Sequence, residues 1–173
     1  ADDIAAEYSE ELPIIIVRPT NNFGSHQFPE KALPRWVCRA LQSRTIPVWG
    51  KGYQVRDWLY VQDACEAFLH LLDHGKAGEA YNLAANNSPE IKNIDLAKIV
   101  VNQLGLTEST IELVPDPRPN HDQRYSLNTE KLQRTGWKPP LNTEQKIRAT
   151  IDWYKNNPSW WTPLMPDSEK IYS

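Results

Sequence analysis

The sequence predicts an α/β protein, on the basis of three observations. Segments with strand character alternate with segments of helical period along the 173 residues. Residues 12–19 contain four consecutive branched aliphatic residues between two prolines, which is typical of a parallel strand buried on both faces. The later strands are short and are separated by small helices. We therefore expect a small α/β lobe attached to the end of a doubly wound sheet.

The first elements follow from local pattern. Residues 1–12 have helical period, but no capping residue precedes them, so the chain is expected to be cut inside a helix of a longer polypeptide. After the branched strand, residues 20–30 are expected to form a loop rich in Asn, Gly and Pro. A helix over residues 33–41 and a short strand over 47–49 follow, and a Gly-Lys-Gly turn ends that strand.

Residues 55–61 are expected to form one strand, with Arg56 and Asp57 near its start. Asp63 is expected to cap a helix over residues 64–73, and Gly75 to end it as a left-handed cap. The apolar face of this helix is expected to consist of Cys65, Phe68, Leu69 and Leu72.

The remaining elements are expected to be strands over 79–84 and 111–114, and helices over 95–104, 129–135 and 143–156. Residues 115–124 are expected to form a charged, proline-rich loop. The tail from residue 158 shows no period, so the helix over 143–156 is expected to be the last.

Composition excludes several classes of protein. The net charge is -3 and no block of consecutive basic residues occurs, which disfavours a nucleic-acid-binding surface. No apolar run approaches the roughly 18 residues needed to cross a bilayer, and no secretory signal is expected. Cys38 and Cys65 lie in amphipathic segments and are expected to be reduced core thiols. We expect a soluble, cytoplasmic protein with neither nucleic acid nor membrane as a partner.

Several familiar catalytic and metal motifs are absent from the sequence. The glycines form neither a dinucleotide-binding fingerprint nor a phosphate loop, and Gly50-Lys51-Gly52 is interpreted as a turn. His70 and His74 are four positions apart but lack the glutamate of a zinc protease, so no metal site is predicted. No serine or cysteine lies in a nucleophile elbow. No catalytic residue is predicted within this chain.

Polar groups suited to one anionic ligand occur in three loops. Asn21 and Asn22 follow the carboxyl end of the first strand, where ligands bind in open α/β sheets. Lys31 begins a helix, where the helix dipole disfavours a cation unless an anion is near. Arg118, His121 and a second arginine share one loop. Each loop could instead carry these residues because they favour turns or because they are solvated at the surface. Arg56 and Asp57 could instead form a salt bridge on an edge strand. Together with Arg56, the three loops favour a convergent site for a dianionic ligand.

Six sequence segments together resemble the C-terminal half of a dTDP-glucose 4,6-dehydratase, an extended short-chain dehydrogenase/reductase. These segments are Asn21-Asn22-Phe23-Gly24, Phe28-Pro29-Glu30-Lys31, Pro47-Val48-Trp49-Gly50-Lys51-Gly52, Arg56-Asp57-Trp58-Leu59-Tyr60-Val61, Gly75-Lys76-Ala77-Gly78-Glu79-Ala80-Tyr81-Asn82 and Arg118-Pro119-Asn120-His121-Asp122-Gln123-Arg124-Tyr125. The resemblance runs from residue 1 to about residue 161. It implies that residues 1–45 end a Rossmann-type domain and that 46–173 are mainly a nucleotide-sugar-binding lobe, with 53–84 returning to the sheet.

The resemblance also implies the chemistry. In this family, bound NAD takes hydride from sugar C4, water leaves across C5 and C6, and hydride returns to C6. Asn22 would contact the cofactor, while Trp49 would offer a stacking face to the base and Arg56 and Arg118 would take the diphosphate. The other residues implied to bind the nucleotide sugar are Asn21, Lys31, Ala32, Pro47, Val48, Asn93 and His121.

Differences from the family pattern concern both detail and activity. A glycine pair is replaced by Ala84 and Ala85, and a glycine by Asn120. The Tyr-x-x-x-Lys pair and the glycine-rich cofactor loop do not occur in this sequence. We therefore expect the fragment to be inactive by itself and the full-length protein to be a homodimer. There are two alternatives. One is a 4-epimerase or UDP-glucuronate decarboxylase of the same superfamily, and the other is a non-catalytic nucleotide-sugar-binding module.

Overall fold

The computed structural model describes residues 2–9, 11–118 and 122–170. Its helices are α1 (Asp2–Tyr8), α2 (Ala32–Leu41), α3 (Val61–His74), α4 (Asn93–Gln103), α5 (Glu130–Gln133), α6 (Thr143–Asn156), α7 (Pro158–Trp161) and α8 (Met165–Lys170). Its strands are β1 (Ile16–Pro19), β2 (Asn21–Phe23), β3 (Ile46–Trp49), β4 (Val55–Arg56), β5 (Trp58–Tyr60), β6 (Ala80–Leu83), β7 (Ile91–Lys92), β8 (Ile111–Val114) and β9 (Arg124–Tyr125). Short 3-10 turns lie at Glu108–Thr110 and Thr162–Leu164.

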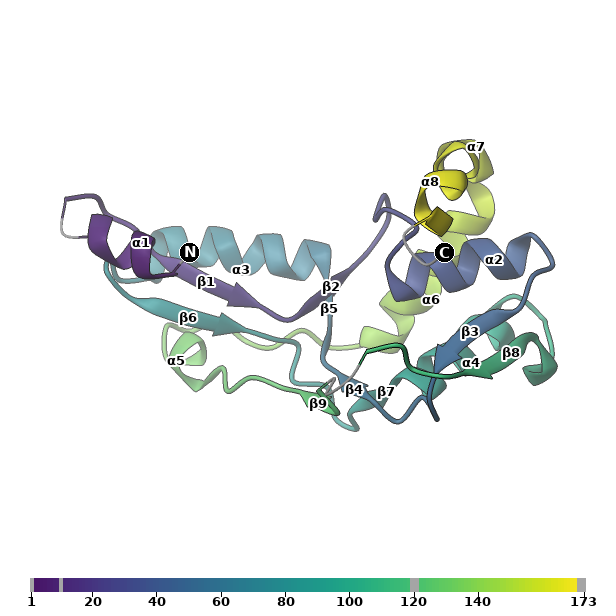
Figure 1. Cartoon of the computed structure of the whole chain (residues 1–173). Helices are drawn as coiled ribbons and strands as arrows, with labels where there is room; N and C mark the ends of the chain where they lie inside the picture. Colours follow the sequence, from purple (N-terminus) through teal and green to yellow (C-terminus); the bar gives the residue numbers. More distant parts are fainter. Residues whose placement is uncertain (1, 10, 119–121, 171–173) are drawn as a thin grey trace.

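Most strand pairs are parallel, as the alternating pattern predicts. The parallel pairs are β1 with β6, β2 with β5 and β3 with β8, and β4 lies between antiparallel β7 and parallel β9. In Figure 1, β1, β6, α3 and α5 occupy one end of the molecule, and α2, α4, α6, β3 and β8 the other. The short strands β2, β4, β5, β7 and β9 lie between the two ends.

Each end of the molecule has its own hydrophobic cluster. The larger one joins α2, α4 and α6 through fully buried residues such as Leu33, Val100 and Ile151, and includes Trp161 and Met165 from the C-terminal helices. The smaller one packs Ala64 and Leu71 of α3 against β5 and β6. Helix α2 thus packs with elements that follow residue 45, whereas Leu59, α3 and β6 pack with Ile15 and Val17 in the smaller cluster. The division expected at residue 45 stays a prediction.

Several expected elements are corrected by tertiary contacts. β1 is only half-buried at Ile16 and Val17 and exposed beyond them, because its described partners, β6 and α3, do not enclose both faces. The loop expected over 20–30 contains strand β2, since β5 supplies a parallel partner. The strand expected over 55–61 is interrupted at Asp57, whose carboxylate accepts hydrogen bonds from the Asn86 N–H at 2.9 Å and from Asn87 Nδ2 at 2.8 Å.

The helix after β5 differs most from expectation. It begins at Val61 with Tyr60 as its N-cap, so Asp63 lies in the first turn instead of capping it. Its buried residues are Ala64, Ala67 and Leu71. The expected apolar face is turned outward, with Leu69 64% and Leu72 76% exposed, so Cys65 is a free surface thiol and Cys38 alone is a core thiol. Ala64, Ala67 and Leu71 follow one another at intervals of three and four residues, so they share the face of the helix that packs on the smaller cluster.

The ends of elements bring two further corrections. Gly75 has φ -79, so it is not a left-handed cap; an added Cβ there would lie 2.5 Å from the Leu71 carbonyl oxygen and 2.8 Å from Ile15 Cδ1. The tail after residue 157 is helical in α7 and α8, because Trp161 and Met165 bury against the larger cluster. Among the described residues, no helix combines the length and hydropathy that a bilayer crossing requires.

Candidate functional site

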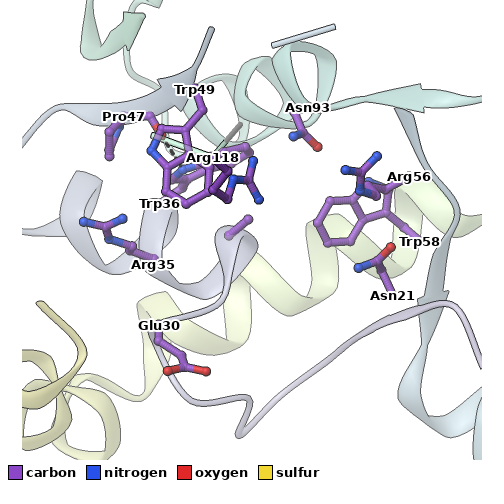
Figure 2. Close-up of a pocket in the computed structure, with 11 residues that line it drawn as sticks. Asn21, Glu30, Arg35, Trp36, Pro47, Trp49, Arg56, Trp58, Asn93 and Arg118 are labelled. Carbon is purple, nitrogen blue, oxygen red and sulfur yellow. Dashed lines mark hydrogen bonds between the residues drawn. The ribbon is translucent and has the colours of Figure 1, made fainter. Parts of the chain in front are cut away.

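A cavity of about 210 Å³ opens between α2, the end of β3, the β4–β5 segment and the loop before residue 119. Its lining residues are Asn21, Glu30, Ala32, Arg35, Trp36, Pro47, Trp49, Arg56, Trp58, Asn93 and Arg118. Seven of the ten residues predicted to bind a nucleotide sugar are among them. In Figure 2, Arg56, Trp58 and Asn21 lie together on one side, whereas Pro47, Trp49, Trp36 and Arg35 lie on the other. Arg118 lies against Trp49 in the second group.

The parallel pairing of β2 with β5 places Asn21 and Trp58 in the cavity wall. The two residues are direct partners in the register of these strands. Trp58 is 5% exposed, and its indole N–H has no hydrogen-bond partner among the described residues. A buried donor without a partner is costly, so this side of the cavity suits a ligand that supplies acceptor oxygens.

Arg56 is a buried cation at the same end. Its side chain donates to the Val55 carbonyl oxygen at 2.6 Å and to the Asp122 carbonyl oxygen at 2.9 Å, and its Cζ lies 5.5 Å from the centre of the Tyr125 ring. Burial, with the nearby positive charge of Arg118 as the second cause, lowers the pKa of Arg56 from its ordinary value. Both effects would be relieved by an anion in the cavity.

Arg118 and Trp49 form the opposite part of the wall. The guanidinium carbon of Arg118 lies 3.9 Å from the centre of the Trp49 ring, a cation–π contact. Asp116 accepts hydrogen bonds from Nε of Arg118 at 3.0 Å and from Nη2 at 3.1 Å. The indole N–H of Trp36 donates to the Pro47 carbonyl oxygen at 2.9 Å and thereby fixes the end of β3 to α2.

Three other predicted residues lie outside this cavity, and one falls outside the described residues. Val48 is fully buried in the larger cluster, because alternate residues of β3 face opposite sides. Lys31 extends from the N-terminus of α2 to an ion pair with Glu30 at 2.6 Å, with 62% of its side chain exposed. Asn22 lines a second cavity of about 230 Å³. His121 lies outside the residues that the structure describes.

Asn22 faces away from Asn21 because successive residues of a strand point to opposite sides. Its Nδ2 donates to the Thr20 carbonyl oxygen at 3.2 Å, while its buried Oδ1 has no hydrogen-bond partner among the described residues. The second cavity is also lined by Gly24 and Val61. A small donor group, such as an amide N–H, fits this acceptor.

Four lining residues were not predicted from the sequence: Glu30, Arg35, Trp36 and Trp58. Trp36 and Trp58 are each 5% exposed, so their place in the sequence pattern does not distinguish them from ordinary core residues. Arg35 is a buried charge in a helix, which is an uncommon position and the one signal that could have identified it. Its Nε lies 3.6 Å from the Glu169 carboxylate, in a tail that was not expected to be ordered as a helix.

Comparison with known proteins places this geometry in a family. Residues 1–84 match the NAD dependent epimerase/dehydratase family. The chain is 42% identical over 158 residues to dTDP-glucose 4,6-dehydratase 1 of Escherichia coli K12, covering 86% of this chain and 43% of that protein. The chain therefore spans about half the length of the curated relatives it matches.

Solved structures give the same result. A dTDP-glucose 4,6-dehydratase from Bacillus anthracis in complex with NAD superimposes with a TM-score of 0.86 at 40% identity, covering 94% of this chain and 52% of that one. DesIV, the dTDP-glucose 4,6-dehydratase of Streptomyces venezuelae with NAD and TYD bound, gives 0.87 at 36% identity, with 94% and 51% covered. Residues 1–84 therefore match the NAD dependent epimerase/dehydratase family, and the chain has a Rossmann-type α/β fold related to that of dTDP-glucose 4,6-dehydratases.

Proposed function

We propose that this chain is the nucleotide-sugar-binding part of an NAD-dependent 4,6-dehydratase that converts dTDP-glucose to a 4-keto-6-deoxy sugar nucleotide. One observation carries the proposal: Arg56 and Arg118, two of the three arginines that line a single cavity, lie there together with the aromatic ring of Trp49. Guanidinium groups suit a diphosphate, and a flat indole suits a nucleobase. Nucleotide sugars combine these two features.

The residues fall into two groups along such a ligand. Arg56 and Arg118 would bind the diphosphate, while Trp49 and Pro47 would hold the base. Asn21 and the indole N–H of Trp58 lie at the Arg56 end and would face the sugar. Asn93, whose backbone N–H donates to the Gln54 carbonyl oxygen at 3.0 Å, would contribute from the start of α4.

NAD would be held in part by Asn22, whose buried Oδ1 fits an amide donor of the cofactor. When bound, NAD supplies the hydride acceptor and donor of the reaction. In this chain, the task of Asn22 is to bind and orient, and that of Trp58 is to shield the substrate side from water. A Tyr-x-x-x-Lys pair does not occur in the sequence, so we expect no turnover by this chain alone. The homodimer expected of the full-length protein stays a prediction.

Binding tests the first part of the proposal. Isothermal titration calorimetry with dTDP is expected to show saturable binding at a single site. Thymidine, which lacks the diphosphate, is expected to bind far more weakly, because the two arginines contribute most of the binding free energy. Equal affinities for the two compounds, or no saturable binding of dTDP, would exclude the assignment.

Product identity tests the second part. The chain would be mixed with a separately produced polypeptide that carries the Tyr-x-x-x-Lys half of a relative, together with NAD and dTDP-glucose. A 4-keto-6-deoxy product, detected by its absorbance in alkali, is expected. An epimerised or pentose product would favour an epimerase or decarboxylase. Binding of dTDP without any product would favour a non-catalytic binding module.

A further inference from the structure

Arg118 is held in place by an acidic residue of its own loop. Asp116 accepts hydrogen bonds from the backbone N–H of Arg118 at 3.1 Å, from Nε at 3.0 Å and from Nη2 at 3.1 Å. Two of these contacts engage one edge of the guanidinium through both carboxylate oxygens. This two-point geometry is the one that arginine also uses to bind a phosphate group. The carboxylate and a ligand phosphate therefore suit the same edge of Arg118.

The carboxylate of Asp116 is itself fixed to the cavity wall. Gln54 is 5% exposed, and its Nε2 donates to Asp116 Oδ2 at 3.3 Å and to the Trp49 carbonyl oxygen at 3.4 Å. Asp116 is thus tied to the residue on which Arg118 stacks. The side chain of Asp116 is 19% exposed and that of Arg118 is 37% exposed, so the pair is partly shielded from water.

The same arrangement covers the aromatic face of Trp49. The guanidinium carbon lies 3.9 Å from the ring centre, which is about one stacking distance and leaves no space for a base on that face. The cavity of about 210 Å³ is also smaller than the roughly 300 Å³ at which ligand pockets usually begin. A base on this face of Trp49 requires Arg118 to move.

The geometry points to Asp116 as a residue that sets ligand affinity, by holding Arg118 where a ligand must displace it. The inference rests on the proposed function, and it adds an exchange to it. When a nucleoside diphosphate enters, Arg118 leaves Asp116 for the diphosphate, and the base takes the place of the guanidinium on Trp49. No covalent bond changes.

The exchange predicts the direction in which a substitution at position 116 changes the affinity for a nucleoside diphosphate. Breaking the contacts between Asp116 and Arg118 is part of every binding event, so its cost lowers the affinity. Removing the negative charge at position 116 removes that cost. A residue that merely prepared Arg118 for the ligand would have the opposite effect, because its loss would leave the guanidinium disordered and weaken binding.

The first experiment is calorimetry with dTDP on the wild type, Asp116→Asn and Glu90→Gln. Glu90 pairs with Arg124 at 2.6 Å and does not line this cavity, so its variant controls for the loss of one negative charge and one arginine pair. Asp116→Asn is expected to bind dTDP about three- to fivefold more tightly than the wild type, the size of a partly exposed ion pair that no longer has to be broken. Glu90→Gln is expected to change the affinity less than about twofold.

The outcomes separate the two proposals. Unchanged or weaker binding by Asp116→Asn, or an equal gain in Glu90→Gln, would overturn the exchange while leaving the proposed function intact. Absence of dTDP binding by all three proteins would overturn the proposed function and the exchange together. If Asp116→Asn fails to fold, a crystal structure of the wild type with dTDP decides. We expect Arg118 on the diphosphate and the base on Trp49, and Arg118 still paired with Asp116 over Trp49 would overturn the exchange.

Discussion

Lys146 of α6 reaches Asp63 of α3, with Nζ 2.7 Å from each carboxylate oxygen. Helix α6 belongs to the larger hydrophobic cluster and α3 to the smaller one, so this ion pair joins the two ends of the molecule. Its side chains are 27% and 14% exposed, and a partly buried ion pair holds its geometry better than one at the surface. The pair therefore helps to fix one end of the molecule against the other.

Replacing Lys146 with Met, which keeps the aliphatic stem, is expected to lower the free energy of unfolding by about 1–3 kcal/mol. The physical reason is that the half-buried Asp63 carboxylate loses its cation. Urea denaturation followed by circular dichroism measures the change. Arg134→Met is the control, because Arg134 pairs with Glu130 on the exposed surface of α5, with Nη2 3.6 Å from the carboxylate. A larger loss for the Arg134 variant would contradict the assignment.

Replacing Arg56 with Ala is expected to weaken dTDP binding by about 2–5 kcal/mol, because a desolvated phosphate would lose its cation. Arg124 lies on the neighbouring strand β9, is exposed and does not line the cavity, so Arg124→Ala controls for the loss of one positive charge. Calorimetry on both variants, with folding checked by circular dichroism, makes the comparison. A loss below about 0.5 kcal/mol for Arg56→Ala would remove this residue from the site.

Cys38 predicts how stability changes in alkali. The thiol is fully buried, and burial raises its pKa from 9.0 to about 12. The unfolded chain therefore releases this proton at lower pH than the folded protein does. The stabilisation is complete below about pH 9 and is lost as the pH rises toward 12. Between pH 9 and 10, the free energy of unfolding is expected to fall less steeply with pH in Cys38→Ala than in the wild type. The smaller side chain also lowers the free energy of unfolding, but by the same amount at every pH, so the slopes can still be compared. Parallel slopes in urea titrations would show that the thiol does not titrate in this way.

Gly75 and Gly78 are expected to tolerate different substitutions. Gly75 has φ -79 and lacks space for a Cβ, whereas Gly78 has φ +80 and no atom within 4 Å of an added Cβ. Asn at Gly78 is expected to cost less than about 1 kcal/mol, since Asn adopts left-handed backbone with little strain. Ala or Asn at Gly75 is expected to cost about 1–3 kcal/mol through steric overlap with Leu71 and Ile15. Thermal denaturation of the variants provides the test, and equal costs at the two sites would contradict it.

Local pattern predicted much of the framework. The alternation of elements indicated the α/β class, and the expected boundaries of the helix over 143–156 and the strand over 111–114 agree with α6 and β8. These segments succeed because their apolar residues have a clear period and their ends are marked by Pro, Gly or Asn. Seven of the ten residues proposed for the nucleotide sugar, Arg56 and Arg118 among them, line one cavity. That grouping came from family resemblance combined with residue chemistry.

What the tertiary structure decided was the direction in which residues face. The apolar pattern of α3 suggested Leu69 and Leu72 as its inner face, but Ala64, Ala67 and Leu71 are the residues buried there. Both sets of residues lie at helical spacing, so hydrophobicity alone does not reveal which of the two faces packs against β5 and β6. Likewise, the sequence places Asp116 near Arg118, but only the fold brings Arg118 over the Trp49 ring and links Asp116 to Trp49 through Gln54. Strand pairing between β3 and β8 joins these residues, which are distant along the chain. Local composition sets the elements and the chemistry available, and long-range packing decides which of those groups share a cavity.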